Sequence, residues 1–588
     1  MMREKPLALP VGIDNFREIR DEEYYYIDKT MMIQDFLTFR DKVSLITRPR
    51  RFGKTLNMTM LRDFFDIEQN SEAIFSGLAI KKTKYASQLN TRPVIYLTFK
   101  GCSGKDIEHL KVSLAMVMKD EYFKHQEILS NSKRVDWKSN QYYEFHQIYQ
   151  AFKELVAKIN GDKKIDDTIL KRSLLVLTRT LSIFYDQKPI LLIDEYDQPL
   201  INAHDEKFRE QFSKRIYTDF LGNALKGSDY LHQALLTGIQ RVAKESVFSK
   251  LNNFSVYTVA DKQYATYFGL TEKEAKQALA DHELTHNEEV RQYYDGYRIG
   301  GYSLYNPWSI LNYLNKKKLE PYWVNTSTNV LIRELIPNAD REFHGEFEEL
   351  IVDKEVVVNA NLDASFIELE TTETLWGLLV NAGYLTIIED FGGQDFLLRI
   401  PNQEVRNEFR KIVANYTGVG DSRLSQIFNA LSRADMNRFL KLYQKFVYDL
   451  VSYHDVKQAK LKNKKPYHLE NNYHMLFLGM AASVEGMYKL TSNLETGDGR
   501  SDVILESLQP TLRPHIVIEF EQGEDVATLK QKGLNQIIEK RYYRKLKGRV
   551  LCVGIAHNMK QCELVHQEII VDEFGEFVNK ANFVPQNQ

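Results

Sequence analysis

The sequence is poor in cysteine, with three among 588 residues, at positions 102, 552 and 562. They are scattered and form no C-x-x-C pair, which excludes a disulfide framework and a cysteine-rich zinc site. No apolar run approaches the roughly 18 residues that span a bilayer, and the first apolar stretch is too short for a secretory signal. We therefore expect a reduced, cytoplasmic protein with no membrane partner.

An excess of either charge is also missing. Lys and Arg number 78 and Asp and Glu 80, giving a net charge of −2. This balance excludes a globally basic nucleic-acid coat and an acidic disordered chain, although a local basic face stays open. Only 14 prolines and 29 glycines leave little room for long disordered linkers. The length predicts about three or four domains.

Short apolar runs alternate with helical stretches in the first third of the chain, which is typical of a parallel α/β sheet. Residues 103–188 are charged and periodic, and predict a helical insertion into that sheet. The strands that we expect lie at 42–47, 93–99, 189–195 and 232–238.

The segment RPRRFGKT, residues 48–55, follows an expected strand and opens an expected helix, as a phosphate-binding loop does. Lys54 would reach the β- and γ-phosphates and Thr55 would hold Mg²⁺. The full pattern has glycine where this chain has Arg48, so the loop is a variant and unusually cationic. A basic turn that only caps a helix is the alternative. The residues expected to bind nucleotide are Arg51, Phe52, Gly53, Lys54 and Thr55.

Two adjacent carboxylates, Asp194 and Glu195, end the apolar run ILLIDE. Asp194 would hold Mg²⁺ and Glu195 would polarise a water, which favours nucleotide hydrolysis. Asp197 is either a supporting carboxylate or the cap of the next helix. Thr237 ends another strand and could orient the attacking water. Arg241 could contact a γ-phosphate in its own subunit or in a neighbour's, which would require a homo-oligomer; a surface arginine is equally compatible.

Five blocks in order resemble the AAA-ATPase-like family of bacterial proteins over about residues 6–330: GIDNFREIRDEEYYYIDKT, TRPRRFGKT, LLIDEYDQP, TGIQRVAKESVFSKLNNF and YDGY…YNPWS. The resemblance implies an ASCE-type ATPase fold with ATP as the nucleotide. The aromatic blocks at 24–29 and 295–308 are then structural, with an adenine pocket as the alternative.

A carboxylate cluster is expected near the C-terminus. Asp502 begins one strand, and Glu519 and Glu521 share a face of the next, so a hairpin would bring all three together. Such clusters bind hard divalent metals and support phosphodiester hydrolysis. Glu470 or Glu485, on a preceding helix, would complete the metal shell. A solvated strand face is the alternative, but PHIVIEF does not alternate cleanly.

The order helix–strand–strand–helix–strand with D…ExE resembles the PD-(D/E)XK nuclease superfamily over about residues 467–570, and Gln536 and Tyr542 match its Q…Y motif. The resemblance implies Mg²⁺ or Mn²⁺ and nucleic acid. One departure is Glu521, where the family has lysine. A minority of relatives use a second glutamate at this position, and in others a lysine of the following helix, here Lys532 or Lys540, takes over; the site is therefore either a Glu-variant nuclease or a decayed one.

The segment EKRYYRKLKGR, residues 539–549, carries six basic residues and two tyrosines. Such a mix suits phosphate contacts with base stacking, on DNA or RNA. Basic residues near a helix C-terminus also complement the helix dipole, so both interpretations stay open.

The expected architecture is a multidomain α/β protein. It comprises an AAA-like P-loop ATPase domain (1–340), a mostly helical, winged-helix-like middle domain (341–455), an exposed linker or loop (455–466) and a restriction-endonuclease-like αβββαβ domain (467–588). We expect ATP hydrolysis to gate or drive a metal-dependent nuclease; a nucleotide-switched docking protein with an inactive nuclease fold is the alternative. The expected catalytic residues are Lys54, Glu195, Asp502, Glu519 and Glu521.

Overall fold

The computed structural model describes the chain in thirteen stretches. They cover 6–130, 140–157, 164–203, 206–226, 229–241, 254–323, isolated positions between 336 and 350, 355–363, 371–416, 421–459, 487–496, 499–558 and 561–578. The chain forms two compact units, Met1–Asn325 with Val357–Glu404 and Thr326–Val356 with Val405–Gln588. Within the described stretches, no helix is long and apolar enough to cross a membrane.

A five-stranded parallel sheet in the order β2-β3-β4-β1-β5 is the centre of the first unit. The strands are β1 (Val43–Thr47), β2 (Val94–Thr98), β3 (Ile190–Asp194), β4 (Gln233–Gly238) and β5 (Phe254–Tyr257). The middle strands β1, β3 and β4 are wholly buried, which explains their unbroken apolar runs. The four predicted strands are confirmed. The fifth, β5, is a short, half-buried edge strand whose sequence FSVY carries little signal.

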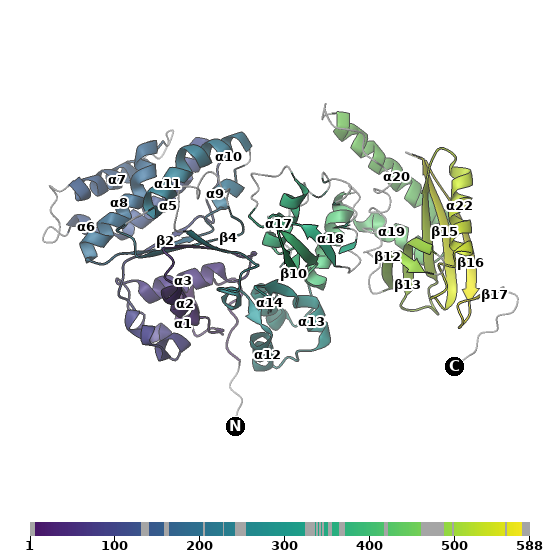
Figure 1. Cartoon of the computed structure of the whole chain (residues 1–588), viewed down its shortest axis with the longest axis horizontal. Helices are drawn as coiled ribbons and strands as arrows, with labels where there is room; N and C mark the ends of the chain where they lie inside the picture. Colours follow the sequence, from purple (N-terminus) through teal and green to yellow (C-terminus); the bar gives the residue numbers. More distant parts are fainter. Residues whose placement is uncertain are drawn as a thin grey trace, which may run out of the picture. The chain divides into compact units, whose positions relative to one another are not determined.

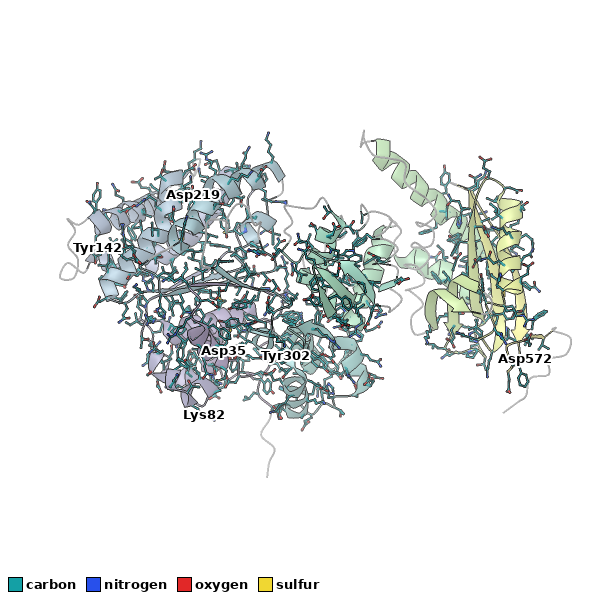
Figure 2. The ribbon with its side chains drawn as sticks, viewed as in Figure 1. Asp35, Lys82, Tyr142, Asp219, Tyr302 and Asp572 are labelled. Carbon is teal, nitrogen blue, oxygen red and sulfur yellow. The ribbon has the colours of Figure 1, made fainter. Side chains whose placement is uncertain are left out.

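Helices cover both faces of this sheet (Figure 1). One layer holds α5 (Ile107–Lys124), α6 (Glu127–Ser130), α7 (Asn140–Ala157), α8 (Asp167–Tyr185), α9 (Gln198–Ile201), α10 (Glu206–Phe212) and α11 (Thr218–Leu225). The other holds α1 (Phe16–Asp21), α2 (Met31–Phe39), α3 (Lys54–Phe65) and α4 (Glu72–Phe75). Figure 2 places Asp219 of α11 and Lys82, after α4, on opposite outer sides of these layers. The predicted helical content of 103–188 is confirmed in α5 to α8.

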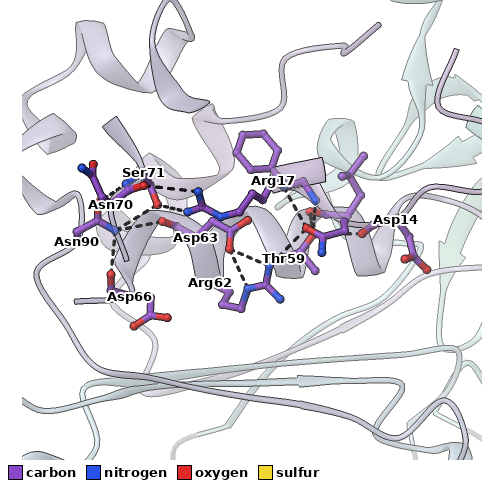
Figure 3. Close-up of polar contacts among 12 residues, drawn as sticks. Asp14, Arg17, Thr59, Arg62, Asp63, Asp66, Asn70, Ser71 and Asn90 are labelled. Carbon is purple, nitrogen blue, oxygen red and sulfur yellow. Dashed lines mark hydrogen bonds and ion pairs between the residues drawn. The ribbon is translucent and has the colours of Figure 1, made fainter. Parts of the chain in front are cut away.

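Polar contacts hold α1 against α3, the helix that follows the phosphate-loop motif (Figure 3). Thr59 Oγ1 accepts the Phe16 N–H at 3.0 Å, and Arg17 donates to Ser71 Oγ at 2.8 Å. Asn90 Oδ1 accepts the Ser71 N–H at 2.9 Å. Because these buried and half-buried groups satisfy one another, the position of α3 is fixed from the side opposite the sheet.

Smaller elements complete the first unit. A three-stranded sheet, β6 (Leu270–Thr271), β7 (Tyr297–Ile299) and β8 (Tyr302–Tyr305), accompanies α12 (Glu272–Asp281), α13 (Glu288–Tyr294) and α14 (Pro307–Lys316). Then α17 (Thr372–Ala382) leads into the hairpin β10 (Thr386–Gly392) and β11 (Asp395–Arg399), and β9 (Val356–Asn359) pairs with β11. A helix followed by a hairpin agrees with the expected order of elements here, and the winged-helix-like character of the middle segment stays a prediction.

The second unit is built on a mixed six-stranded sheet in the order β12 to β17. Its strands are β12 (Tyr488–Thr496), β13 (Gly499–Ser507), β14 (His515–Gln522), β15 (Gly548–Asn558), β16 (Gln561–Val571) and β17 (Phe577–Val578). The helix α22 (Val526–Glu539) packs closely on the sheet at Gly554, where a Cβ would lie 2.2 Å from the Lys530 carbonyl oxygen. The remaining helices are α18 (Gln403–Tyr416), α19 (Asp421–Ser432) and α20 (Met436–Ala459).

Two expectations about this region need correction. Residues 455–459 continue α20 instead of opening a linker, because DVKQA contains no helix breaker. The nuclease-like domain has the predicted βββαβ order and then two further strands, β16 and β17, which the sequence patterns do not predict. In β16 charged residues interrupt the apolar ones, since part of the strand is exposed. The helix expected before β12 lies outside the described residues, and the domain boundaries stay predictions.

Candidate functional sites

The phosphate-loop motif lies between β1 and α3, at the carboxyl edge of the parallel sheet. Gly53 caps α3 with φ +82°, a left-handed conformation that glycine adopts without strain. Lys54 is 6% exposed, and its ammonium donates to the carbonyl oxygens of Arg48 and Pro49 at 2.9 Å each. The amine is therefore held inside the loop, where the first N–H groups of α3 point.

Arg48 stands where the full motif has glycine, and the structure explains this substitution. Its guanidinium is fully buried and donates to the backbone carbonyls of Tyr257, Thr258 and Gln263 at 2.7–3.2 Å. Burial lowers its pKa to about 9. Arg48 thus ties the loop to the segment after β5. The cationic loop that Arg48, Arg50 and Arg51 predict stays a prediction, because a guanidinium with this pKa keeps its charge at neutral pH.

Arg51 and Phe52, both expected to bind nucleotide, have side chains engaged elsewhere. The Arg51 guanidinium lies 3.9 Å from the centre of the Trp308 ring, a cation–π contact. The Phe52 side chain is fully buried and packs edge-on against Tyr297, with ring centres 4.9 Å apart. The buried Phe52 ring is therefore not available to a nucleotide, whereas the exposed Arg51 stays a predicted nucleotide contact.

The ends of β3 and β4 converge on the loop. Asp194 is fully buried and accepts hydrogen bonds from the Thr55 hydroxyl at 2.7 Å and the Thr237 hydroxyl at 2.6 Å. The neighbouring Glu195 has φ +53°, a strained conformation for a non-glycine residue. Burial raises the pKa of Glu195, against the opposing charge of Lys54. One carboxylate and one hydroxyl side by side are a suitable donor pair for Mg²⁺.

Asp197 and Arg241 have structural partners in this arrangement. Asp197 is 1% exposed and accepts the N–H groups of Ile239 and Gln240 at 2.9 and 3.1 Å, so it holds the segment that follows β4. Arg241 pairs with Asp363 at 3.0 Å. This ion pair accounts for the Arg241 side chain without a phosphate.

An apolar cavity of about 80 Å³ adjoins Gly53. The predicted aromatic block at 24–29 contributes to its wall, and Pro307 and Leu311 of α14 close it from another element. The residues from that block are Tyr25, Tyr26, Ile27 and Lys29. The sequence reveals the block but does not place it beside the loop, because residues 26 and 53 meet only in the tertiary fold.

Gly383, after α17, is a further residue at this site that no sequence pattern indicates. It has φ +87°, and a Cβ there would lie 2.8 Å from Pro49 Cβ of the phosphate loop. We expect Gly383→Ala to push the loop and to weaken ATP binding about tenfold, which corresponds to ~1.4 kcal/mol, in a titration with a fluorescent ATP analogue.

Gly392→Ala is the matched control for this substitution. Gly392 has a similar φ of +83°, and a Cβ there would have no neighbour within 4 Å, so alanine brings the backbone strain alone. Equal losses of ATP affinity in the two variants would contradict a contact between Gly383 and the loop.

The C-terminal carboxylates meet as the sequence predicts. Antiparallel pairing of β13 and β14 brings Asp502 beside Glu519. Glu519 Oε2 accepts the Asp502 N–H at 3.2 Å, and Asp502 Oδ2 accepts the Phe520 N–H at 2.8 Å. Glu519 is 5% exposed, and burial together with the charge of Asp502 raises its pKa to about 8. Such a crowded pair of oxygen donors fits a divalent metal.

The helix α22 faces these acids with two side chains one turn apart. Lys532 donates to Glu521 Oε2 at 2.9 Å, whereas Gln536 donates to Glu519 and to the Tyr542 hydroxyl. Glu519 and Glu521 therefore share a face, and the Q…Y pair is assembled. Lys532, rather than Lys540, is the lysine that contacts the cluster. Glu470 and Glu485 lie outside the described residues.

The tyrosines of the basic segment 539–549 are not available for base stacking. Tyr542 and Tyr543 are 2% and 5% exposed and belong to the core between α22 and the sheet. Arg541 pairs with Glu576 at 3.1 Å. The stacking interpretation is wrong, because both tyrosine rings are buried in this core. The sequence does not reveal this, because charged residues surround the two tyrosines.

A parallel sheet with a phosphate-loop motif at its carboxyl edge fits a P-loop ATPase-like domain, and the mixed sheet with paired acids fits a nuclease-like domain. Comparison with known proteins agrees. Residues 10–248 match the family described as "Predicted AAA-ATPase", and residues 468–567 match the PD-(D/E)XK nuclease superfamily. The chain therefore carries a predicted AAA-ATPase domain and a PD-(D/E)XK nuclease superfamily domain.

Among curated proteins, the "Uncharacterized protein in vnfD 5'region" of Azotobacter chroococcum mcd 1 is 28% identical over 416 residues, 69% of each chain. Among solved structures, the chain is similar to the Signal Transduction ATPase with Numerous Domains (STAND) protein with a tetratricopeptide repeat sensor from Pyrococcus horikoshii. That match has 10% identity and a TM-score of 0.21, and covers 79% of this chain and 58% of the other.

Proposed function

We propose that this protein binds and hydrolyses ATP, and that its nucleotide cycle gates a metal-dependent nuclease. The observation that carries the ATPase assignment is the position of Asp194, which joins the hydroxyls of Thr55 and Thr237 beside Lys54 and Glu195. These groups come from the phosphate loop and from two strand ends that are distant in sequence. A purely structural cap of α3 would not need them together.

Each residue has a separate task in this proposal. Lys54 and the N–H groups that open α3 bind the phosphates, and Glu195 accepts the proton of the attacking water that Thr237 orients. Thr55 and Asp194 would hold Mg²⁺, which supplies charge neutralisation when bound. The apolar cavity beside Gly53 would take the base of the nucleotide.

At the second site, Asp502 and Glu519 would hold Mg²⁺ or Mn²⁺ against a phosphodiester, and Lys532 would take the role of the lysine that Glu521 replaces. An open polar surface of α22 lies next to this cluster. It offers amide and ammonium groups suited to a phosphate backbone: Gln531, Lys532, Asn535, Gln536 and Lys540.

The test is cleavage of plasmid and single-stranded DNA with Mg²⁺ or Mn²⁺, with and without ATP. We expect wild-type cleavage to depend on ATP and the Lys54→Ala variant to lose that dependence. If both proteins cleave equally, with or without ATP, the nuclease activity does not depend on the nucleotide cycle. RNA substrates in parallel distinguish the two nucleic acids.

The second candidate is a nucleotide-switched docking protein whose nuclease fold is inactive. The ion pair between Lys532 and Glu521 favours it, because each side chain satisfies the other's charge. Calorimetric titration with Mn²⁺ separates the candidates. Heat of binding that is unchanged in an Asp502→Ala, Glu519→Ala double variant would favour docking, and heat that disappears would favour the nuclease.

A further inference from the structure

Three potential metal ligands gather on the first unit, away from the phosphate loop. Glu68 follows α3, His125 ends α5 and Glu127 begins α6. One donor atom from each lies within 4.8 Å of the others. These residues take no part in either site described above, and nothing in the phosphate-loop chemistry calls for them.

His125 is the unusual member of this cluster. It is 4% exposed, yet neither ring nitrogen forms a hydrogen bond with any residue that the structure describes. Its Nδ1 lies 3.4 Å from Glu68 Oε1, which is long for a hydrogen bond. Two ligands at ~2.0–2.2 Å from a tetrahedral Zn²⁺ are about 3.3–3.5 Å apart. The observed separation fits two ligands that share one ion, and it is also an ion-pair distance.

The neighbours of the cluster resemble the supporting contacts of a metal site. Glu121 is 2% exposed, and its Oε1 lies 3.8 Å from His125 Nε2, an ion-pair distance rather than a hydrogen bond. The Tyr185 hydroxyl donates to Glu68 and lies 3.3 Å from Glu127 Oε1, which holds the two exposed carboxylates together. The Ile67 N–H donates to the Arg92 carbonyl at 2.8 Å and anchors the loop that bears Glu68.

The charges around His125 also favour a cation. Three carboxylates, those of Glu68, Glu121 and Glu127, face one ammonium, that of Lys124, which lies 2.5 Å from Glu121. A metal-bound His125 would be the neutral imidazole, and in that form the three carboxylates and the one ammonium leave an excess of two negative charges, which a divalent ion balances. Without metal, burial opposes protonation of His125, but Glu121 and Glu68 outweigh it and raise the pKa of His125 to about 9, as the imidazolium alternative requires.

We propose that Glu68, His125 and Glu127 bind a divalent transition-metal ion, with Zn²⁺ as the best match to one imidazole and two carboxylates. The ion would fasten the end of α5 and the start of α6 to the loop after α3. Because Glu68 and Glu127 are exposed, water can complete the coordination. The alternative is an imidazolium ion that the carboxylates hold without metal.

The experiment uses the full chain, stripped of metal and free of nucleotide, in equilibrium dialysis against ZnCl₂ with metal counted by mass spectrometry. We expect His125→Gln and Glu127→Gln each to hold one Zn²⁺ per chain fewer than wild type. Zn²⁺ taken up by other sites cancels in this difference. His109→Gln is the matched control, since His109 lies on α5 in an exposed pair with Asp106 and should keep the wild-type count.

Co²⁺ provides a second readout through its visible absorption. Wild type and His109→Gln should show the intense bands of a tetrahedral site, and Glu127→Gln should lose them. Glu127 is exposed, so this variant carries the test even if the buried His125→Gln fails to fold, as circular dichroism would reveal. A wild-type Zn²⁺ count in Glu127→Gln, or a wild type that holds no Zn²⁺ at this cluster, would overturn the proposal in favour of the imidazolium.

Discussion

Replacing Glu195 with glutamine should lower the turnover of ATP by about 10²–10⁴-fold, the usual contribution of a general base. Glu195 follows β3 in a left-handed conformation, next to Asp194 and Lys54. Glutamine keeps the size of the side chain but cannot accept a proton. ATP affinity should stay within a few-fold of wild type, because the phosphate contacts come from Lys54 and from the start of α3.

Phosphate release and equilibrium nucleotide binding, measured on the same samples, check this prediction. Lys54→Ala should lose affinity as well as turnover, so the two variants separate proton transfer from binding. Glu210→Gln is the control, since Glu210 is exposed and pairs only one turn away with Lys214. Turnover above a tenth of the wild-type rate in Glu195→Gln would show that Glu195 is not the general base.

Asp502→Asn should abolish metal-dependent cleavage, with a loss of about 10³-fold or more, because a metal contributes several kcal/mol to stabilisation of the transition state. Asp502 and Glu519 are adjacent across β13 and β14, and burial first and the charge of Asp502 second raise the pKa of Glu519. Asparagine removes one charge and one oxygen donor. Mn²⁺ titration and DNA cleavage with the same preparation measure both effects.

Lysine variants on α22 then test which side chain replaces the missing motif lysine. Lys532→Ala should retain metal binding and lose cleavage at least tenfold. Lys530→Ala is a close control, because Lys530 is on the same helix and also pairs with a glutamate, Glu563, at 2.6 Å. Equal cleavage in the two variants would mean that Lys532 only neutralises Glu521, and Lys540→Ala would then be the next variant to assay.

Local sequence patterns predict the four strands β1 to β4, the phosphate-loop motif and the strands that bear the C-terminal acids, but not β5, β16 or β17. An unbroken apolar run such as ILLID marks a buried strand whatever surrounds it, and the Gly-Lys-Thr after β1 needs only its own backbone to bind phosphate. The pairing of Asp502 with Glu519 was equally predictable, since a short hairpin leaves few registers. The sequence predicts a linker or loop at 455–459 where the structure has the end of α20, because lysine-rich helices and lysine-rich loops have similar compositions.

The sequence by itself thus determined the fold class, the phosphate loop and the identity of the clustered acids. Only the tertiary structure decided that Arg48 is buried against backbone carbonyls, that Gly383 contacts Pro49, and that His125 meets Glu68. Each of these contacts joins segments that are more than fifty residues apart in the sequence, or depends on the direction of one side chain. Periodicity reports only which residues share a local face, whereas such contacts depend on how whole elements pack.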